Sequence, residues 1–552
     1  MLSSTTGFVL MDLTDSKVVF NGMLSDAGKI DEWRPGEFFY NADFSSFQSR
    51  GKYKLSITIK GKNYTSDEFQ IDDNALARLT IPSILHYYRK QRADTKGEMT
   101  ADEQVQLAGS EERVDMRGGW CDASGDVSKY FSHLAYANYM SPQQIPLVTW
   151  SLVNTTEAIP KLLTELGVKD SIVDESLWGA DYIMRALSKD DYFRMIIFSY
   201  FKKDPSARRV VGLLADSKTT ADYQSAFREG GGMAIASLAR ISRWKKYGAF
   251  TSAQYLEGAK RAFAHLLINN TKYDDDGKEN IIDDYCALMA ATELWIATDD
   301  ALYQNEARKR AKSIANRLSS KGYFFANDAG RPYWHASDAG LPIVSLSRYL
   351  KKESDVGLRN AALEVIKKAL DYNLSVTHNV SNPFGYARQS FLFQNKVTDG
   401  FFIPHENETG WWWQGENARL GSLATAALVG GKLVYPKPGS WGISDPLAGF
   451  ASRQISWILG CNPYSMCFLY QFGRNNVPYM SSNYGHGSER GGISNGITGK
   501  DGKADGSGID FKNTAEGNEW RWTEQWIPHA AWFLQAVTAM AENSEEQHTT
   551  DK

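Results

Sequence analysis

The apolar positions of the chain follow two different periods. Up to about residue 72 they alternate with polar positions, and the run 53–59 (YKLSITI) does so at every step, as a half-buried strand does. Similar strand-like runs lie at 8–11, 17–20, 38–40 and 67–71. Several short strands at this spacing predict a small β-sandwich over residues 1–72.

From about residue 73 the apolar period becomes helical. One helical face, for example, carries Val173, Leu177, Ala180, Met184 and Leu187. Further helical runs lie at 76–92, 231–246, 252–268, 283–297, 302–318, 338–350, 357–373, 415–430, 446–459 and 528–541. So many helices with few strands predict a mostly α domain over residues 73–552, built as a closed ring of helix hairpins or as an open solenoid. No repeat of about 34 or 40 residues is visible, which argues against helical repeat arrays.

Two long stretches between the predicted helices are rich in Trp, Tyr, Asn and Gly. They span about 374–414 and 461–527. Connections longer than about 15 residues are usually functional or disordered, and this aromatic composition is not that of a disordered segment. We therefore expect both stretches to form walls of a cleft.

Composition and charge exclude several classes of protein. A net charge of −4 over 552 residues offers no basic surface for nucleic acid. No run of about 18 apolar residues appears, so no membrane span is expected, and the first residues lack the basic and apolar regions of a signal peptide. The aromatic share of 12% fits a large core, and it also suits a cleft in which sugar rings stack on aromatic side chains.

The four cysteines indicate reduced thiols. Cys121, Cys286, Cys461 and Cys467 are too few for a disulfide framework in so long a chain, and their spacing matches no zinc motif. We therefore expect a cytoplasmic protein with no cofactor and no metal site. The sequence does not indicate an oligomeric state.

A glycine-rich segment, 118–130 (GGWCDASGDVSKY), carries two carboxylates, Asp122 and Asp126. Two ionised carboxylates that lie close together repel each other, so their pKa values separate, which suits general acid/base catalysis. The alternative is a polar loop in which an aspartate caps a helix.

A third carboxylate, Glu524, stands between Trp522 and Trp526. Apolar surroundings raise the pKa of a carboxyl group, as a general acid requires. The alternative is a glutamate that stabilises the start of the helix that follows. Glu516 and Glu519 are rival candidates for the acid.

Five further residues are candidates for contact with a substrate. They are His486, Trp413, Glu416, Asn417 and Glu229. For each of the first four, packing or capping within the protein is an alternative of similar weight.

Four segments in this order resemble glycoside hydrolase family 9. They are 118–126, the Gly-x-Asn-Pro segment 460–463 with a downstream histidine, 411–419 and 522–533. Residues 1–72 resemble the immunoglobulin-like module that precedes many catalytic domains of this family. The resemblance implies an (α/α)6 barrel with its active site at the loop end and an inverting mechanism. It further implies that Asp126 is the base that deprotonates water, that Asp122 helps to hold this water, and that Glu524 is the acid.

Three departures from the family pattern concern the sugar that is bound. The two aspartates are one residue further apart than in the usual Asp-Ala-Gly-Asp, 475–482 lacks the usual Pro-His-His-Arg, and 529–531 (HAA) replaces Tyr-Asn-Ala. The chain is most similar to an atypical branch, the exo-β-D-glucosaminidases of marine bacteria. The implied reaction releases glucosamine from the non-reducing end of a chitosan oligosaccharide or of GlcN-β-1,4-GlcNAc. A protonated amine on the sugar would need a carboxylate partner, which the two aspartates or Glu229 could supply.

Two other functions remain open. One is a cellodextrinase or endo-β-1,4-glucanase of the same family, which would share the three carboxylates and differ in its sugar pocket. The other is a non-catalytic carbohydrate-binding protein. In each case the partner is a soluble oligosaccharide.

Overall fold

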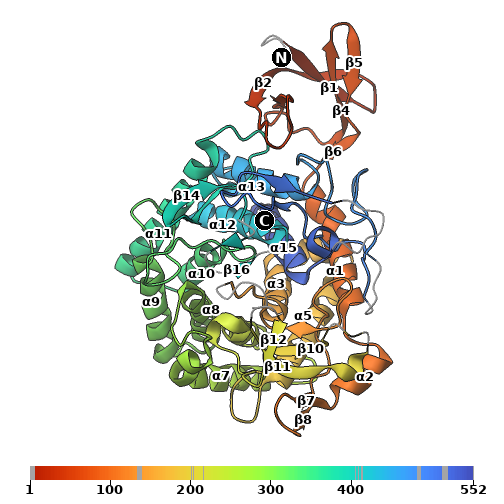
Figure 1. Ribbon diagram of the computed structural model, residues 1–552. Coiled ribbons are helices and arrows are strands. Elements are labelled where there is room, and N and C mark those ends of the chain that lie inside the picture. The colour runs from red at the N-terminus through yellow and green to blue at the C-terminus, as the bar shows by residue number, and fades with distance from the viewer. Residues whose placement is uncertain are drawn as a thin grey trace.

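The computed structural model (Figure 1) describes residues 6–133, 140–200, 202, 204–214, 217–403, 406–407, 410–411, 414–480, 486–512 and 520–550. Figure 1 shows a small β-rich module as a separate lobe at the top of the view, above a larger helical domain. In the described chain no helix is both long enough and apolar enough to span a membrane.

The module is an antiparallel sheet of six strands. They are β1 (Gly7–Asp12), β2 (Val18–Gly28), β3 (Phe39–Ala42), β4 (Gly51–Ile59), β5 (Lys62–Thr65) and β6 (Phe69–Ile71). The order is β3-β2-β1-β4-β5, and β6 also pairs with β4. Leu10 of β1 lies opposite Leu55 of β4 and is fully buried, as the alternating pattern requires. The strands end at Ile71, and the first helix begins at Ala75.

The helical domain is a double ring. Its six inner helices are α3 (Ile145–Ala158), α6 (Gly232–Ile241), α8 (Ile281–Thr298), α10 (Leu341–Leu350), α12 (Asn417–Val434) and α15 (Ile527–Thr550). Each inner helix packs against the next, and α15 closes the ring against α3. The six outer helices are α1 (Ala75–Gln91), α5 (Lys169–Ala186), α7 (Ser252–Tyr273), α9 (Ala301–Asn316), α11 (Val356–His378) and α13 (Asp445–Ile458). This is an (α/α)6 barrel, and the predicted fold class is confirmed.

The two rings differ in how their side chains are buried. Along the inner helix α8, every residue from Ile281 to Trp295 is buried, because this helix has neighbours on all sides. Glycines allow the inner helices to approach closely: a β-carbon on Gly232 would lie 2.6 Å from the carbonyl oxygen of Cys286. The outer helix α5 instead buries one face and exposes the other.

Two regions differ from the sequence predictions. The helix α3 was not predicted, because its sequence is rich in β-branched residues, which favour strands. The stretch 374–414 is not a continuous loop: it contains a hairpin of β13 (Gln389–Phe393) and β14 (Lys396–Gly400).

A second sheet supports the segment with the two aspartates. Its strands are β7 (Val105–Leu107), β8 (Arg113–Val114), β9 (Lys129–Tyr130), β10 (Ile196–Phe198), β11 (Arg209–Leu214) and β12 (Lys218–Thr220), in the order β8-β7-β11-β10-β9 with β12 paired to β11. The short pairs β15 (Glu406–Asn407) with β16 (Gly410–Trp411) and β17 (Thr498–Gly499) with β18 (Ile509–Asp510), and the short helices α2 (Lys96–Asp102), α4 (Pro160–Glu165) and α14 (Trp520–Thr523), complete the domain. Because β9 follows Asp126 by only three residues, the sheet fixes one end of that segment.

A buried tryptophan of the module packs into the barrel. Trp33 lies between β2 and β3, is only 6% exposed, and packs edge-on against Phe401 with ring centroids 4.7 Å apart. Its indole nitrogen donates a hydrogen bond to the carbonyl oxygen of Ser507 at 2.7 Å. The module therefore shares part of the core of the catalytic domain.

We expect Trp33→Ala to cost about 3–5 kcal/mol of stability, because it removes a buried aromatic side chain and its hydrogen bond. Calorimetry should show a lower melting temperature for the helical domain as well as for the module. The matched control is Tyr64→Ala on the exposed strand β5, where the side chain is 47% exposed and the expected change is within about 0.5 kcal/mol. Equal melting temperatures for the two variants would contradict the anchoring role.

Candidate active site

The segment 118–130 forms a tight, almost entirely buried loop, in which only Asp126 is partly exposed. Its three glycines, Gly118, Gly119 and Gly125, have positive φ angles of 99°, 72° and 92°, which glycine adopts without strain. The loop folds back on itself, since the Asp122 amide donates to the carbonyl oxygen of Ser128 at 2.9 Å. Both aspartates are therefore held on one compact turn.

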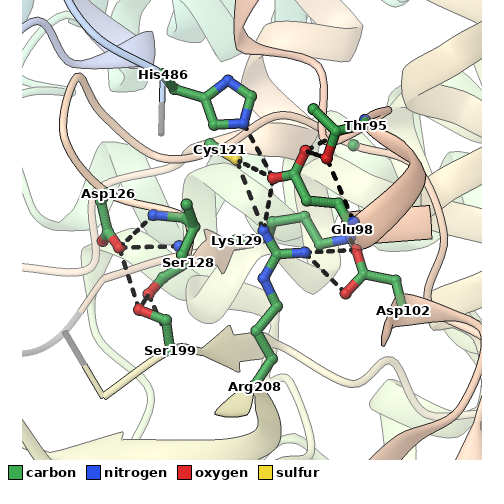
Figure 2. Close-up of polar contacts among 12 residues, drawn as sticks. Thr95, Glu98, Asp102, Cys121, Asp126, Ser128, Lys129, Ser199, Arg208 and His486 are labelled. Carbon is green, nitrogen blue, oxygen red and sulfur yellow. Dashed lines mark hydrogen bonds and ion pairs between the residues drawn. The ribbon is translucent and has the colours of Figure 1, made fainter. Parts of the chain in front are cut away.

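Asp126 is held by backbone amides through one oxygen only (Figure 2). Its Oδ1 accepts hydrogen bonds from the amides of Val127 at 2.6 Å and Ser128 at 2.9 Å, and from the Ser199 hydroxyl at 3.4 Å. Among the described residues nothing donates to Oδ2. Donors of this kind stabilise a negative charge, so the geometry suits an ionised carboxylate with one oxygen open to water.

Asp122 has a less polar environment. Its side chain is only 7% exposed, and its Oδ1 accepts a hydrogen bond from the indole nitrogen of Trp526 at 2.9 Å. Burial raises the pKa of Asp122 well above its usual value, and the charge of Asp126 adds to the shift. The pair can therefore hold one proton between two carboxyl groups.

Glu524 joins this pair from the other end of the chain. It lies between α14 and α15, and its Oε2 accepts hydrogen bonds from Gln414 at 3.2 Å and Asn495 at 3.3 Å. Burial raises the pKa of Glu524 well above its usual value, and the charges of Asp122 and Asp126 act in the same direction. No described residue donates to Oε1. Glu524 is therefore a carboxyl group that retains its proton and has one oxygen open.

Several hydrogen bonds join the two segments, and two of them connect Ser124 with Gln525. The Ser124 amide donates to the Gln525 carbonyl oxygen at 2.8 Å, and the Gln525 amide donates to the Ser124 hydroxyl at 2.8 Å. These bonds connect residues 401 positions apart in the sequence. The three predicted carboxylates are thus brought together by direct contact between their own segments.

The sequence analysis missed the residues that orient Glu524. Asn495 donates to Glu524, and the side-chain oxygen of Asn495 in turn lies 2.8 Å from Nε2 of His529. Burial lowers the pKa of His529 to about 3, so its ring is neutral and donates from Nε2. The unusual His529 after the acid was visible in the sequence, but its partner was not.

His486 does not have the predicted substrate contact. One ring nitrogen lies 3.0 Å from the carbonyl oxygen of Lys90, and the other lies 2.9 Å from a carboxylate oxygen of Glu98. The side chain is 8% exposed. Both nitrogens are occupied by protein acceptors, so the structure corrects this expectation and makes His486 an internal residue.

Glu416 and Asn417 are also internal. Glu416 accepts hydrogen bonds from the Tyr386 hydroxyl at 2.7 Å and the Ile403 amide at 2.7 Å, and Asn417 donates to the Ser494 carbonyl oxygen at 2.7 Å. Both side chains are buried and form hydrogen bonds within the protein, which corrects the prediction that they contact substrate.

Three other candidates, Trp413, Glu516 and Glu519, lie outside the described residues.

Glu229 remains a candidate for ligand binding. It lies in the π-helical turn Phe227–Gly231 ahead of α6, is 3% exposed, and its Oε2 has no hydrogen-bond partner. Burial raises the pKa of Glu229 to about 8. The neighbouring Gly230 packs directly against the backbone of Phe131, just beyond the segment with the two aspartates.

A carboxylate, a thiol and an imidazole lie close together in this region. Their potential ligand atoms, from Glu98, Cys121 and His486, are all within 4.8 Å of one another. These groups resemble a ligand set for a thiophilic cation. However, the Arg208 guanidinium donates to Glu98 at 2.9 Å and approaches the Cys121 sulfur at 3.9 Å. A divalent cation would therefore lie beside a buried positive charge, and the cluster is better described as an ion-pair network.

The arrangement as a whole is that of an acid and a base. Asp126 offers an open oxygen on a carboxylate that is stabilised in its charged form, and Glu524 offers an open oxygen on a carboxyl group that burial keeps protonated. Two titratable groups whose environments favour opposite protonation states can deprotonate a nucleophile and protonate a leaving group. Fold and site together define a glycoside hydrolase with an (α/α)6 barrel.

Comparison with known families agrees with this class. The model of glycosyl hydrolase family 9 matches residues 80–507, and that of the cellulase N-terminal ig-like domain matches residues 2–62. The chain belongs to glycosyl hydrolase family 9 and carries an N-terminal immunoglobulin-like module, as the sequence resemblance implied.

Several known proteins are similar to the chain. A cellodextrinase from Butyrivibrio fibrisolvens is 25% identical over 372 residues, which cover 61% of this chain and 63% of that protein. A metagenome-derived endoglucanase of glycoside hydrolase family 9 has a TM-score of 0.65 at 17% identity, covering 98% of this chain and 93% of its own. A thermostable endoglucanase variant from Alicyclobacillus acidocaldarius has a TM-score of 0.65 at 15% identity, covering 97% and 95%. At these identities the solved structures support the fold.

The raised pKa of Glu524 predicts how stability depends on pH. The folded protein binds this proton more tightly than the unfolded chain, so the group lowers stability progressively as pH rises above about 4.5, the value expected in the unfolded chain. We expect Glu524→Gln to match the parent near pH 4 and to be increasingly more stable than the parent as pH rises to 7.

Denaturant melts at pH 4, 5.5 and 7 check this prediction. The control is Glu364→Gln on the outer helix α11, where the carboxylate is exposed and pairs with Lys368 at 3.4 Å. A difference between Glu524→Gln and the parent that does not grow with pH would contradict the assigned protonation state.

Proposed function

We propose that the chain is an inverting glycosidase that cleaves β-1,4 bonds in short soluble glucan oligosaccharides, as a cellodextrinase does. The observation that carries this proposal is that two carboxyl groups meet in different surroundings: Asp126 accepts hydrogen bonds from two backbone amides, whereas burial raises the pKa of Glu524. The similar cellodextrinase and the solved endoglucanases support a β-1,4-glucan as the substrate.

The proposed reaction follows from these surroundings. Glu524 donates its proton to the glycosidic oxygen as the bond from that oxygen to the anomeric carbon breaks. Asp126 takes a proton from a water molecule that attacks the same carbon from the opposite face, so the configuration inverts. Asp122 helps to hold this water. The site returns to its starting state when Asp126 releases a proton to solvent and Glu524 regains one.

A second candidate substrate is a glucosamine-containing oligosaccharide, as the departures from the family pattern suggest. The supporting observation is Glu229, a buried carboxyl group with an unpaired oxygen. A protonated amine on the sugar would provide the positive charge that this group lacks.

We also propose that the protein works in the cytoplasm. The supporting observation is that all four cysteines are free thiols, three of them buried.

We expect Asp126→Asn and Glu524→Gln each to lower kcat by about 10²- to 10⁴-fold, because each removes one partner of the acid–base pair. Hydrolysis of a cello-oligosaccharide, or of the glucosamine substrate if that is the one cleaved, measures the effect. Glu364→Gln is the control and should retain full activity. A parent protein that binds oligosaccharide without turnover would instead indicate a carbohydrate-binding protein.

Paired substrates decide the sugar. We expect cellotetraose to be cleaved faster than the matching glucosamine tetramer, and NMR of fresh product should show the α-anomer first. Initial release of the β-anomer would contradict the inverting mechanism. If the glucosamine tetramer is preferred, Glu229→Gln should reduce its cleavage and leave the cellotetraose rate unchanged.

A further inference from the structure

A cluster of buried charges lies beside the segment that carries Asp126 (Figure 2). It contains the carboxylates Glu98 and Asp102 of α2, the cations Lys129 of β9 and Arg208, and the imidazole of His486. The side chains of these five residues are between 0% and 8% exposed. Burying so many charges is costly unless each one is paired, so the network has to be well ordered.

Ion pairs and hydrogen bonds connect the charges of the cluster. Arg208 donates to Glu98 at 2.9 Å and to Asp102 at 2.8 Å, and Lys129 donates to Asp102 at 2.7 Å. Lys129 also donates to the carbonyl oxygens of Met116 and Gly118 at 2.7 and 2.8 Å. The cluster therefore binds both ends of the loop that contains the aspartates.

His486 connects the cluster to the base itself. Its backbone carbonyl oxygen accepts a hydrogen bond from the Gly125 amide at 2.8 Å, and Gly125 directly precedes Asp126. The backbone of His486 has a φ of 48°, in the left-handed region that a residue with a β-carbon rarely adopts. The strained backbone of His486 therefore requires an additional interaction that holds it in this conformation.

The side chain of His486 supplies that restraint. Its two ring nitrogens contact Lys90 and Glu98, so the doubly protonated ring has an acceptor on each side. Burial acts to lower the pKa of His486, but its neighbours Cys121 and Glu98 outweigh this effect and raise the pKa above its usual value. Burial raises the pKa of the Cys121 thiol, so Glu98 is the anion that holds the imidazolium.

We propose that the hydrogen bond from the His486 ring to the Glu98 carboxylate positions Asp126 for catalysis, by fixing the His486 carbonyl that holds the Gly125 amide. This inference rests on the proposed role of Asp126 as the base. Glu98 and His486 contact neither the open oxygen of Asp126 nor Glu524, so they are positioning residues that act through the loop. A base displaced by about 1 Å slows the reaction by about 10²-fold, whereas the binding of the sugar is affected much less.

Three substitutions at position 486 separate this hydrogen bond from the backbone conformation. His486→Gly and His486→Asn both favour the left-handed backbone, but neither side chain reaches Glu98. His486→Gln tolerates this backbone less well, but its terminal amide can occupy the place of Nε2 and donate to Glu98. The proposal therefore expects glutamine to be the best replacement.

The measurements are kcat and KM on the substrate that the parent cleaves, together with the melting temperature. We expect kcat to fall by about 10- to 100-fold for the glycine and asparagine variants and by less than about 5-fold for glutamine, with KM within about 2-fold throughout. Equal kcat values for the three variants, or a rise in KM that accounts for the loss, would overturn the proposal.

Two further variants keep the test decisive. Glu98→Gln retains the shape of the acceptor without its charge and should lower kcat with little change in KM, even if a variant at position 486 fails to fold. Glu293→Gln breaks a buried ion pair with Arg348 at 2.8 Å between inner helices of the barrel, and should lower the melting temperature without changing kcat at 25 °C. If Glu98→Gln leaves kcat unchanged, the hydrogen bond to the Glu98 carboxylate has no positioning role.

The outcome is separable from that of the proposed function. Full activity in Asp126→Asn would reject Asp126 as the base. Loss of activity in Asp126→Asn together with full activity in His486→Gly would reject the positioning role alone.

Discussion

The contact between Ser124 and Gln525 is the interaction on which the site depends. It places the loop with Asp126 beside the start of the last inner helix, 401 residues further along the chain. That helix, α15, reaches this position because it closes the ring against α3. The acid and the base therefore face one another only once the whole barrel has formed, and any change that opens the ring should separate them.

Burial then determines the protonation states of the carboxyl groups. Asp122 and Glu524 lie in surroundings that disfavour a charge, and the neighbouring carboxylates raise the pKa of each further: Asp126 that of Asp122, and both aspartates that of Glu524. Asp126, in contrast, accepts hydrogen bonds from two backbone amides, and such donors stabilise a negative charge. The same enclosure that keeps the acid protonated therefore makes the folded protein less stable as pH rises, so activity and stability are in conflict at Glu524.

The sequence predicted the fold, and it singled out three carboxylates whose segments the structure brings together, because both leave local signals. Helical periods mark the amphipathic outer helices, and the two aspartates stand in one short segment. Side-chain direction leaves no such signal. His486 turns toward Glu98, 388 residues away, and Glu416 turns toward Tyr386 and Ile403. Their interpretation as substrate contacts could not be corrected without the positions of those partners. The helix α3 was missed for a different reason: its many β-branched residues resemble those of a strand.

The departure in spacing between the aspartates now has a structural meaning. Compared with Asp-Ala-Gly-Asp, the form found here has Ser124 as its additional residue, and Ser124 makes both hydrogen bonds to Gln525. On the opposite side of the same loop, Gly125 is held by His486 and the charged cluster. Hydrogen bonds between neutral groups thus hold the loop at Ser124, next to the segment of Glu524. Ion pairs hold it through His486 at Gly125. The extra residue lengthens the loop and also supplies the contact that holds it, so a longer spacing is compatible with a rigid base.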